Sequence, residues 1–250
     1  MATTSPAHAI GVDIGGTGIK GAPVDLDAGA FTAERIRIPT PQPATPDAVA
    51  AVVKDIVTQL DAPGSIGVTL PSVILDGIVH TAANIDRDWI GTDAKALFQE
   101  ATGRPVDVVN DADAAGIAEV RFGAGRDQSG VVLLLTLGTG IGSALFVDGT
   151  LVPNTELGHL PLRHGDAEDW AAESVREDDD LSWKEWGHRL TVYIELVEKL
   201  LWPKLVIIGG GVSKKSDKYL RYVHTRTEIV PAQLLNDAGI IGAALFAPTA

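Results

Sequence analysis

The chain has no cysteine among its 250 residues. Disulfides, thiolate metal ligands and cysteine nucleophiles are therefore excluded, and the composition is typical of a reducing compartment. The first eight residues lack the basic and apolar regions of a secretory signal. The longest apolar stretch, residues 131–147, is broken by glycines and hydroxyl side chains, so it predicts buried strands and a turn, not a membrane span. We accordingly expect a cytoplasmic protein without a membrane partner.

Positive charge is also scarce. The chain carries 20 Lys and Arg against 33 Asp and Glu, which gives a net charge of −13 at pH 7. Such a charge disfavours nucleic acid as a partner, because phosphate backbones are themselves anionic. The sequence has one concentration of cations, which follows a triple-glycine turn: Lys214, Lys215, Lys218, Arg221 and Arg226. A charge run of this kind is commonly a solvated surface, and the binding of an extended anion is the alternative.

Two short loops rich in glycine and threonine stand out. One spans residues 13–18 and the other residues 137–142, and each follows an apolar run. Glycine leaves the backbone N–H groups uncovered and permits unusual dihedral angles, so such a turn can surround phosphate oxygens. The recurrence of the loop in both halves of the chain suggests a duplicated half-domain that binds a phosphate chain from two sides.

Two familiar nucleotide motifs fit these loops poorly. Residues 16–21 match the pattern G-x-G-x-x-G, but a dinucleotide-binding fold requires a helix to begin at that loop. Pro23 and the turn-rich residues 25–29 favour a β-hairpin instead. Neither loop ends in Gly-Lys-Ser/Thr, which a Walker A loop requires.

Hydrophobic periodicity predicts strands that alternate with helices, which is typical of the α/β class. The predicted strands are residues 9–14, 18–24, 65–75 with a turn at Pro71-Ser72, 106–109 and 205–208. The predicted helices are residues 47–60, 92–102, 112–122, 181–201 and 237–246. Four tryptophans lie within or near the fourth helix, and their helical spacing is more typical of a core than of a ligand platform: Trp170, Trp183, Trp186 and Trp202.

Asn110 and Asp111 lie between a predicted buried strand and a predicted helix. Ligands of open α/β sheets bind at the carboxyl ends of strands. An aspartate at that place can accept the proton of an attacking hydroxyl, which is the general-base role in phosphoryl transfer. It can equally cap the helix by accepting a backbone N–H bond, and the sequence leaves both interpretations open. Asp113 is expected on an exposed helix surface.

Glu156 and His159 belong to a Glu-Leu-Gly-His segment and share one side of a turn if that segment is helical. Together they offer hydrogen-bond acceptors and a donor to neighbouring sugar hydroxyls. The alternative is a surface glutamate beside a structurally bonded histidine. Metal binding is disfavoured because His164 is the only other nearby imidazole. Glu168 fits either a ligand of the same sugar or a solvated helix start.

Taken together, these motifs resemble the ROK sugar-kinase family of the actin-like ATPase superfamily over nearly the whole chain. Residues 13–17 and 137–140 are similar to its phosphate signatures, and its sugar signatures resemble Asn84, Asn110, Asp111 and residues 156–159. More narrowly, residues 181–186, 200–203 and 209–215 resemble the actinobacterial polyphosphate glucokinases, which include the polyphosphate/ATP glucomannokinases.

The resemblance implies an actin-like (ribonuclease H-like) α/β sugar-kinase fold with two domains and a central cleft. A small domain, residues 1–109 completed by residues 238–250, would precede a large one, residues 110–237. Asp111 would be the base toward the sugar 6-hydroxyl. The donor phosphates would be bound by Asp13, Gly15, Gly16, Thr17, Gly18, Lys20, Gly138, Thr139, Gly140, Gly210, Lys214 and Lys215. The hexose would be bound by Pro71, Ser72, Asn84, Asn110, Asp111, Glu156, His159 and Glu168.

The reaction implied by the resemblance is transfer of the terminal phosphoryl group of inorganic polyphosphate, or of ATP, to glucose. Mg²⁺ would be organised by Asp13 through water and not by a direct cage of protein ligands. Many relatives hold a structural zinc with cysteines just after the Glu-x-Gly-His motif. This chain has none, so we expect no zinc, and other contacts must hold residues 160–168.

The alternative functions are an ATP-only glucokinase, a sugar-sensing regulator and a polyphosphate hydrolase. The regulator is disfavoured because only twelve residues precede Asp13, too few for a helix-turn-helix module. The sugar signature at Glu156 and His159 disfavours the hydrolase. The choice of polyphosphate or ATP, the acceptance of mannose, and the choice between monomer and homodimer stay open at this point.

Overall fold

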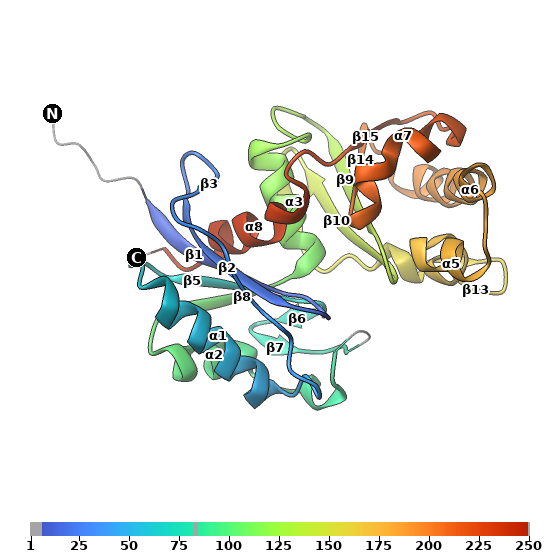
Figure 1. The fold of residues 1–250 in the computed structure, drawn as a ribbon. Helices are drawn as coiled ribbons and strands as arrows, with labels where there is room; N and C mark the ends of the chain where they lie inside the picture. Colours follow the sequence, from blue (N-terminus) through green and yellow to red (C-terminus); the bar gives the residue numbers. More distant parts are fainter. Residues whose placement is uncertain (1–6, 83–84, 250) are drawn as a thin grey trace, which may run out of the picture. The chain divides into compact units, whose positions relative to one another are not determined.

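The structure is a computed structural model that describes residues 7–82 and 85–249. The chain divides into two compact units (Figure 1). Unit 1 holds the described residues up to Ala118 together with the C-terminal residues from Asp237 on, and unit 2 is Glu119–Asn236. Each unit has a sheet and a core of its own, so each is described by itself.

The sheet of unit 1 has the strand order β3-β2-β1-β5-β8, with β4 paired to β2. β1 (His8–Ile14) and β2 (Ile19–Asp25) form an antiparallel hairpin, whereas β1, β5 (Ile66–Leu70) and β8 (Val106–Asn110) run parallel. β3 (Ala30–Phe31) and β4 (Ile36–Ile38) are short. Because β1 leads into a strand and not into a helix, the predicted hairpin is confirmed and a dinucleotide-binding loop is excluded.

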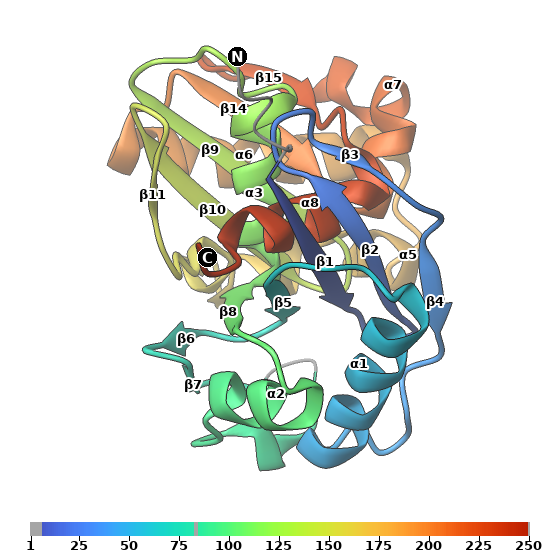
Figure 2. The ribbon, with the colours of Figure 1, turned by 90° about the vertical axis from the view of Figure 1, so that its left-hand side faces the viewer.

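The two faces of this sheet are covered in different ways. On one face α1 (Pro46–Leu60) and α2 (Ala94–Thr102) enclose an aliphatic core. On the other face α8 (Ala238–Phe246) packs on β1 and β5 (Figure 2). The approach of α8 is so close that a side chain at Gly11 or Gly67 would meet its backbone. The smaller elements are β6 (Ile74–Leu75), β7 (Ile78–Val79) and η1 (Arg87–Trp89).

The sheet of unit 2 repeats the plan of the first. Its order is β11-β10-β9-β14-β15. β9 (Val131–Leu137) and β10 (Ile141–Val147) form an antiparallel hairpin, and β9 runs parallel to β14 (Leu205–Gly209), which runs parallel to β15 (Glu228–Pro231). β11 (Thr150–Val152) extends the hairpin side. In both units the glycine loop joins the two strands of the hairpin, which confirms the predicted duplication.

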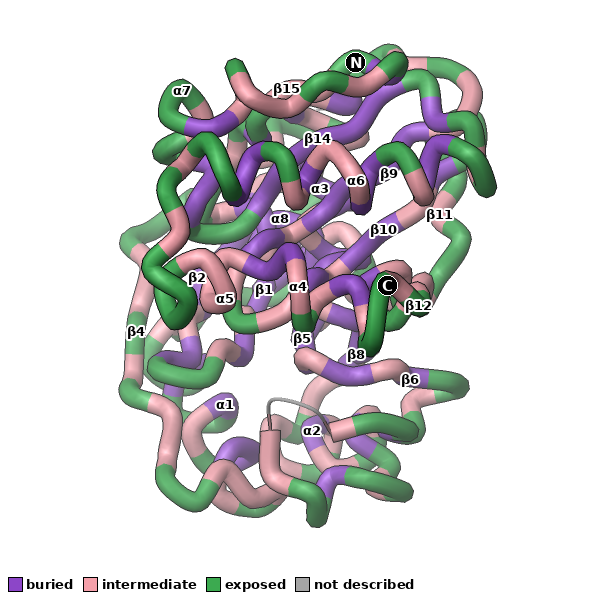
Figure 3. Tube along the Cα trace, turned by 90° about the vertical axis from the view of Figure 1, so that its right-hand side faces the viewer, coloured by how far each residue is buried: buried purple, intermediate pink, exposed green. Residues whose placement is uncertain are grey.

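α6 (Trp183–Leu201) covers the sheet of unit 2. Ser182 and Glu185 form a reciprocal capping box at its start, which explains where the helix begins. Buried side chains of α6, among them Trp186, Leu190 and Tyr193, pack on buried residues of β9 and β14, strands that Figure 3 draws largely as buried. The remaining elements are η2 (Leu157–His159), β12 (Pro161–Leu162), β13 (Gly165–Asp166), α4 (Glu168–Ala171), α5 (Glu173–Asp178), η3 (Gly211–Lys215), α7 (Ser216–Tyr219), η4 (Leu220–Tyr222) and η5 (Leu235–Asp237).

α3 (Asp111–Phe122) begins in unit 1, directly after β8, and ends in unit 2. The predicted helices and long strands are confirmed, and their ends lie within two residues of the prediction apart from the break of residues 65–75 into β5 and β6 at the expected turn. One expectation is wrong: Asp113 is not on an exposed surface but is 1% exposed. The described part of the chain contains no helix with the length and hydrophobicity of a membrane span.

Candidate active site

The first glycine loop, residues 14–18, closes the β1–β2 hairpin. The N–H of Gly15 donates to the carbonyl of Gly18 at 3.2 Å, which sets the turn. Two side chains from outside the loop hold it in place. The hydroxyl of Thr40 donates to the Gly15 carbonyl at 2.5 Å, and Arg37 Nη2 donates to the Thr17 carbonyl at 3.1 Å. Side chains of the same unit therefore satisfy the carbonyl oxygens of Gly15 and Thr17.

A row of charged side chains crosses the sheet beside this loop. Asp13 pairs with Lys20 across β1 and β2, and Lys20 pairs with Arg37 across β2 and β4, so the three side chains share one face. Lys20 Nζ lies 3.4 Å from Asp13 Oδ2. The hydroxyl of Thr69 donates to Asp13 Oδ1 at 3.1 Å and accepts from the N–H of Ile14 at 3.1 Å. The Asp13 carboxylate is thus oriented from two neighbouring strands.

A hollow of about 260 Å³ lies in unit 1 against the same loop. Its lining includes Gly15 and Gly16 and also Pro71, a residue that the sequence assigned to the hexose. Thr40 and Asp86 line it as well, and neither was predicted. The hollow therefore joins part of the predicted phosphate loop to part of the predicted sugar site. Asn84 lies outside the described residues.

The start of α3 is tied to the turn that follows β5. Asn110 Nδ2 donates to the Ser72 carbonyl at 3.2 Å, and Asn110 Oδ1 accepts from the N–H groups of Ala112 and Asp113 at 2.8 and 3.0 Å. Asp111 Oδ1 also accepts from the N–H of Ala112 at 2.8 Å. Asn110 is therefore the cap of α3, and the carboxylate of Asp111 is held at the helix N-terminus.

The second glycine loop, residues 138–140, closes the β9–β10 hairpin of unit 2. The N–H of Gly138 donates to the Gly140 carbonyl at 3.1 Å. Ser174 is the second residue of α5. It donates its N–H to the Gly138 carbonyl at 3.0 Å and its hydroxyl to the Thr139 carbonyl at 2.7 Å. Glu168 Oε2 accepts the N–H of Ile141 at 3.0 Å.

Three carboxylates surround His159. Its Nδ1 lies 2.8 Å from Asp166 Oδ2 and 3.8 Å from Glu168 Oε1, and its Nε2 lies 3.9 Å from Glu156 Oε2. The hydrogen bond to Asp166 raises the pKa of His159, and the nearby negative charges add to this effect. Burial raises the pKa of the Glu156 carboxyl, and the charge of Glu168 adds to it. The predicted Glu156, His159 and Glu168 are thus brought together.

The segment after His159 is held without cysteine. β12 and β13 pair as a small hairpin, and the N–H of Ala167 donates to the Leu160 carbonyl at 2.9 Å. The N–H of Asp166 donates to Asp169 Oδ2 at 3.2 Å, and the guanidinium of Arg163 lies 4.6 Å from the ring centroid of Trp170. Across residues 7–82 and 85–249, no group of three or more His, Asp or Glu side chains is arranged to hold a metal ion.

The triple-glycine turn after β14 lies against the end of β9. Gly210 has φ of 80°, a value that favours glycine, and a side chain there would meet the backbone of Leu137. The turn leads into η3, where Lys214 and Lys215 are exposed, and Lys215 Nζ lies 3.9 Å from Glu173 Oε1. In unit 2 the predicted phosphate residues therefore lie close together. Gly210 packs against Leu137, which precedes the second glycine loop, and Lys215 lies near Glu173 at the start of α5.

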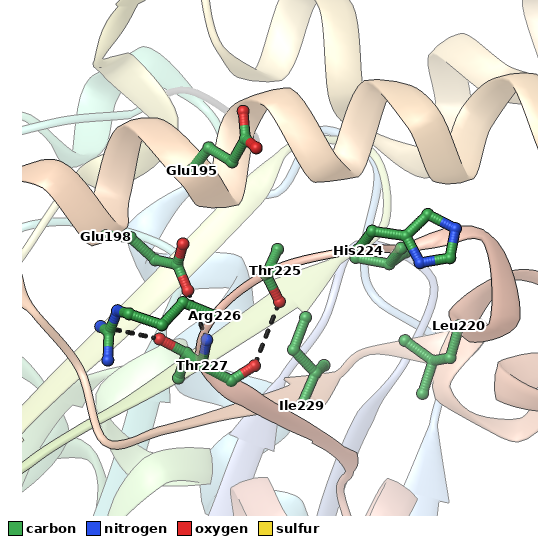
Figure 4. A pocket seen from close by; sticks show the side chains of 9 residues that line it. Glu195, Glu198, Leu220, His224, Thr225, Arg226, Thr227 and Ile229 are labelled. Atoms are coloured by element: carbon green, nitrogen blue, oxygen red, sulfur yellow. Dashed lines mark hydrogen bonds between the residues drawn. The ribbon is translucent and has the colours of Figure 1, made fainter.

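Unit 2 also has a hollow of about 520 Å³ that contains none of the predicted residues (Figure 4). Its polar groups bind one another: Glu198 Oε1 accepts the N–H of Thr227 at 2.5 Å, Arg226 Nη2 donates to the Thr227 hydroxyl at 3.1 Å, and the Thr225 hydroxyl donates to the Thr227 carbonyl at 3.1 Å. The bond to Glu198 fastens the segment before β15 to α6, and the other two bonds lie within that segment, so these groups have a structural role.

Sequence reasoning missed five residues of these sites: Arg37, Thr40, Asp86, Asp166 and Ser174. None of them belongs to a glycine loop or a recognisable motif. Arg37 reaches the first loop only because β4 pairs with β2, and Ser174 reaches the second only because α5 starts beside it. Asp166 had a signal in the sequence, because it belongs to the acidic run that contains Glu168.

Two similar α/β units, each with a glycine loop in a β-hairpin, define the actin-like fold of the sugar kinases. Residues 9–171 match the model of the ROK family, and the chain belongs to this family. A polyphosphate glucokinase of Mycobacterium tuberculosis strain CDC 1551 is 49% identical over 243 residues, which cover 97% of this chain and 92% of the relative. The predicted family is therefore confirmed.

Solved structures agree with this assignment. The inorganic polyphosphate/ATP-glucomannokinase from Arthrobacter sp. strain KM has a TM-score of 0.92 and 53% identity, with 96% of this chain and 98% of that chain covered. A ROK family glucokinase from Streptomyces griseus, solved in complex with glucose and AMPPNP, has a TM-score of 0.81 and 25% identity, with 96% and 99% covered.

Proposed function

We propose that the protein transfers the terminal phosphoryl group of inorganic polyphosphate, and also of ATP, to the 6-hydroxyl of glucose. Besides the sequence identity, one observation carries the proposal: each unit presents a glycine loop in a β-hairpin, held by hydrogen bonds from its own unit, with basic residues nearby. Backbone N–H groups and cations are what an anionic donor requires.

Asp111 is the proposed general base. Its carboxylate accepts the proton of the 6-hydroxyl while the sugar oxygen forms a bond to the terminal phosphorus and the bridging P–O bond breaks. The products are hexose 6-phosphate and a donor that is one phosphoryl group shorter. The position of Asp111 at the first turn of α3 suits this role, because its Oδ1 accepts the N–H of Ala112, which holds the carboxylate at the helix N-terminus before the proton arrives.

Asp13 is the proposed site of Mg²⁺. Asp13 offers carboxylate oxygens next to the first loop, oriented by the Thr69 hydroxyl, and such hard oxygens suit this ion through its bound water. The small number of protein oxygens fits an ion that keeps most of its waters. When bound, Mg²⁺ would neutralise charge on the donor phosphates. Lys20 stands 3.4 Å from the same carboxylate and adds a second positive charge there.

We propose the hexose contacts that the family resemblance implies. In unit 1 these are Pro71, Ser72, Asn110 and Asp111, and in unit 2 they are Glu156, His159 and Glu168. Support comes from the bonding of each group within its own unit: Asn110 is fixed by Ser72, and His159 by Asp166. Fixed donors and acceptors discriminate between sugars that differ in one hydroxyl.

The test is a coupled assay of hexose 6-phosphate with polyphosphate and ATP as separate donors, on glucose and on mannose. We expect glucose phosphorylation with polyphosphate, and the mannose arm decides whether a second hexose is accepted. Asp111→Asn should lower kcat about 10²–10⁴-fold, the usual contribution of a general base, with glucose affinity changed by no more than several-fold. Thermal unfolding of the variant checks that it is folded. Normal turnover in Asp111→Asn would remove the assignment of the base.

A further inference from the structure

The hollow of about 260 Å³ in unit 1 has walls from separate parts of the sequence. One wall is the end of β1 with Gly15 and Gly16, and another is the connector of residues 40–44 that follows β4. Pro71 and residues 85–86 complete it. Since β1 and β5 are parallel neighbours, the hollow lies at the carboxyl ends of these strands, where open α/β sheets bind their ligands.

Hydrogen bonds within unit 1 hold these walls in place. The Thr40 hydroxyl donates to the Gly15 carbonyl at 2.5 Å, and the indole Nε1 of Trp89 donates to the Ala44 carbonyl at 2.9 Å. Trp89 is itself buried and packs on Phe98 of α2, with 6.0 Å between the ring centroids. The connector is therefore tied at one end to the glycine loop and at the other to η1, so the hollow is a preformed feature of unit 1.

Two polar side chains that line the hollow have hydrogen-bonding capacity to spare. Asp86 Oδ1 accepts the N–H of Asp88 at 2.9 Å, but its Oδ2 accepts no hydrogen bond from any residue in the ranges 7–82 and 85–249. The side-chain amide of Gln42 likewise has no hydrogen-bond partner in the described part of the chain. A carboxylate oxygen accepts from hydroxyl groups, and an amide both donates to them and accepts from them.

The charge and polarity of the lining select a neutral, hydroxylated ligand. Among the described residues that line the hollow there is a carboxylate but no lysine or arginine, so a phosphate group would be repelled there. Pro43, Pro71 and Ile85 offer apolar surface to the C–H groups of a sugar ring. Pockets for drug-sized ligands measure about 300–1,000 Å³, so the smaller hollow suits a single ring.

The turn after β5 connects the hollow to the proposed base. Pro71 lines the hollow, and the carbonyl of the next residue, Ser72, accepts from Asn110 Nδ2 at 3.2 Å. Asn110 in turn caps α3 and directly precedes Asp111. A hexose that presents its 6-hydroxyl to Asp111 and lies along this turn would have its ring hydroxyls near the hollow.

We propose that Asp86 and Gln42 bind ring hydroxyls of the acceptor hexose and thereby determine which hexoses are phosphorylated. The proposal rests on the proposed function and adds two residues from outside the recognised motifs to its hexose contacts. A site that forms a hydrogen bond to a hydroxyl rejects the sugar in which that hydroxyl is missing, because a polar group of the site is then left without its partner.

The experiment measures KM and kcat for glucose and for its 2-, 3- and 4-deoxy analogues in the wild type, Asp86→Asn and Gln42→Ala. We expect the glucose KM to rise about tenfold in Asp86→Asn and about threefold in Gln42→Ala, since a hydrogen bond to a charged group is the stronger one. The KM for polyphosphate should stay within twofold. Asp86→Asn keeps an oxygen that can accept the N–H of Asp88, so η1 should persist, and thermal unfolding checks this.

Each variant has a matched control outside the hollow. Asp93→Asn makes the same change at another helix cap, because Asp93 Oδ1 accepts the N–H of Ala96 at the start of α2. Gln59→Ala removes an exposed glutamine of α1. Neither control should change the glucose KM by more than twofold.

The analogues identify the hydroxyl that Asp86 binds. For one deoxy analogue the KM of the wild type and of Asp86→Asn should agree within twofold, because the bond that the variant weakens is already missing. Titration calorimetry of glucose into the donor-free protein should show the same loss of affinity as the glucose KM.

A glucose KM and Kd that stay within twofold in both variants would overturn the proposal. An equal loss with glucose and with all three analogues would also overturn it, since no single hydroxyl would then be involved. Failure of the wild type to phosphorylate glucose from any donor would instead contradict the proposed function, while calorimetry would still test the hollow. The two failures are therefore distinguishable.

Discussion

The two glycine loops close equivalent hairpins but are held by side chains of opposite charge. The first is held by Arg37 and Thr40, which donate to its carbonyl groups. The second is held by Ser174 and by the carboxylate of Glu168, which accepts the N–H of Ile141 at its end. Both hairpins are antiparallel, but Ile14 pairs with Ile19 and Leu137 pairs with Ile141, so the first loop is one residue longer. The loops also differ in what packs against them.

This difference explains why some positions in the loops are glycine. Gly18 and Gly140 do not have the positive φ that would itself demand glycine. At Gly18 a side chain would come within 2.7 Å of the Arg37 guanidinium, and at Gly140 it would meet the Glu168 carboxylate. Gly16 and Gly138 have open space instead. The loops therefore contain glycines of two kinds. At Gly18 and Gly140 a neighbouring side chain occupies the place of a Cβ atom, and at Gly16 and Gly138 that place is open.

Gly140→Ala should have the largest effect of the loop substitutions. The new methyl group would displace Glu168 from Ile141, and a lost hydrogen bond to a charged group costs about 1–3 kcal/mol. We expect a Tm lower by about 2–6 °C together with weaker glucose binding, because Glu168 also lies beside His159. Differential scanning calorimetry and glucose titration measure the two effects.

The matched control is Gly138→Ala in the same loop, where a methyl group meets no atom within 4 Å. Its Tm should equal that of the wild type within about 1 °C. Equal losses of Tm in the two variants would show that Glu168 is not the reason for glycine at position 140.

Gly18→Ala should cost less. The atoms that the methyl group meets belong to the end of a long, exposed arginine side chain, which can swing away at the loss of one exposed hydrogen bond to Thr17. We expect a stability change within about 0.5 kcal/mol, measured by urea unfolding, with Gly16→Ala as the control. A loss as large as that of Gly140→Ala would break the distinction between the two loops.

Asp166→Asn should have a small effect that depends on pH. The hydrogen bond to Asp166 raises the pKa of His159, so the stabilisation it gives is fully present below the ordinary histidine pKa of about 6.5 and is lost as pH rises through the folded-state pKa. The variant should lower the pKa of His159, so the midpoint of an NMR titration of its ring proton should move to lower pH. Because the pair is half-exposed, we expect less than about 1 kcal/mol.

Unfolding at two pH values provides the check on that sign. The variant should be less stable than the wild type between about pH 5 and 6 and equal to it well above the His159 pKa. A deficit that is larger at alkaline pH would contradict the assignment of Asp166 as the partner of a protonated His159.

Much of the fold could be predicted from the sequence because it depends on local patterns. The apolar spacing of residues 47–60 specifies α1, and the Pro23 region specifies a hairpin in place of a dinucleotide loop. Short elements such as β4, β12 and β13 carry no comparable pattern. They form because they pair with another strand, β4 with β2 and β12 with β13. Hydrophobic periodicity within such short segments therefore could not predict them.

The candidate site divides in the same way. Asp13, Asp111, Glu156 and His159 were recognisable because each belongs to a contiguous motif with a chemical reason for its spacing. Asp113 was misplaced because a carboxylate in the first turn of a helix gives no sign of what will pack against it. Arg37 and Asp166 were not recognised for a related reason, since each has its partner in another element.

The order of residues alone determined the two hairpins, their glycine loops and the acidic and imidazole groups that follow the strands, since these depend on neighbours within a few positions. Only tertiary packing decided which side chain contacts which loop. Hydrogen bonds act over a few ångströms, and only the folded chain brings Arg37 to Gly18 and Glu168 to Gly140.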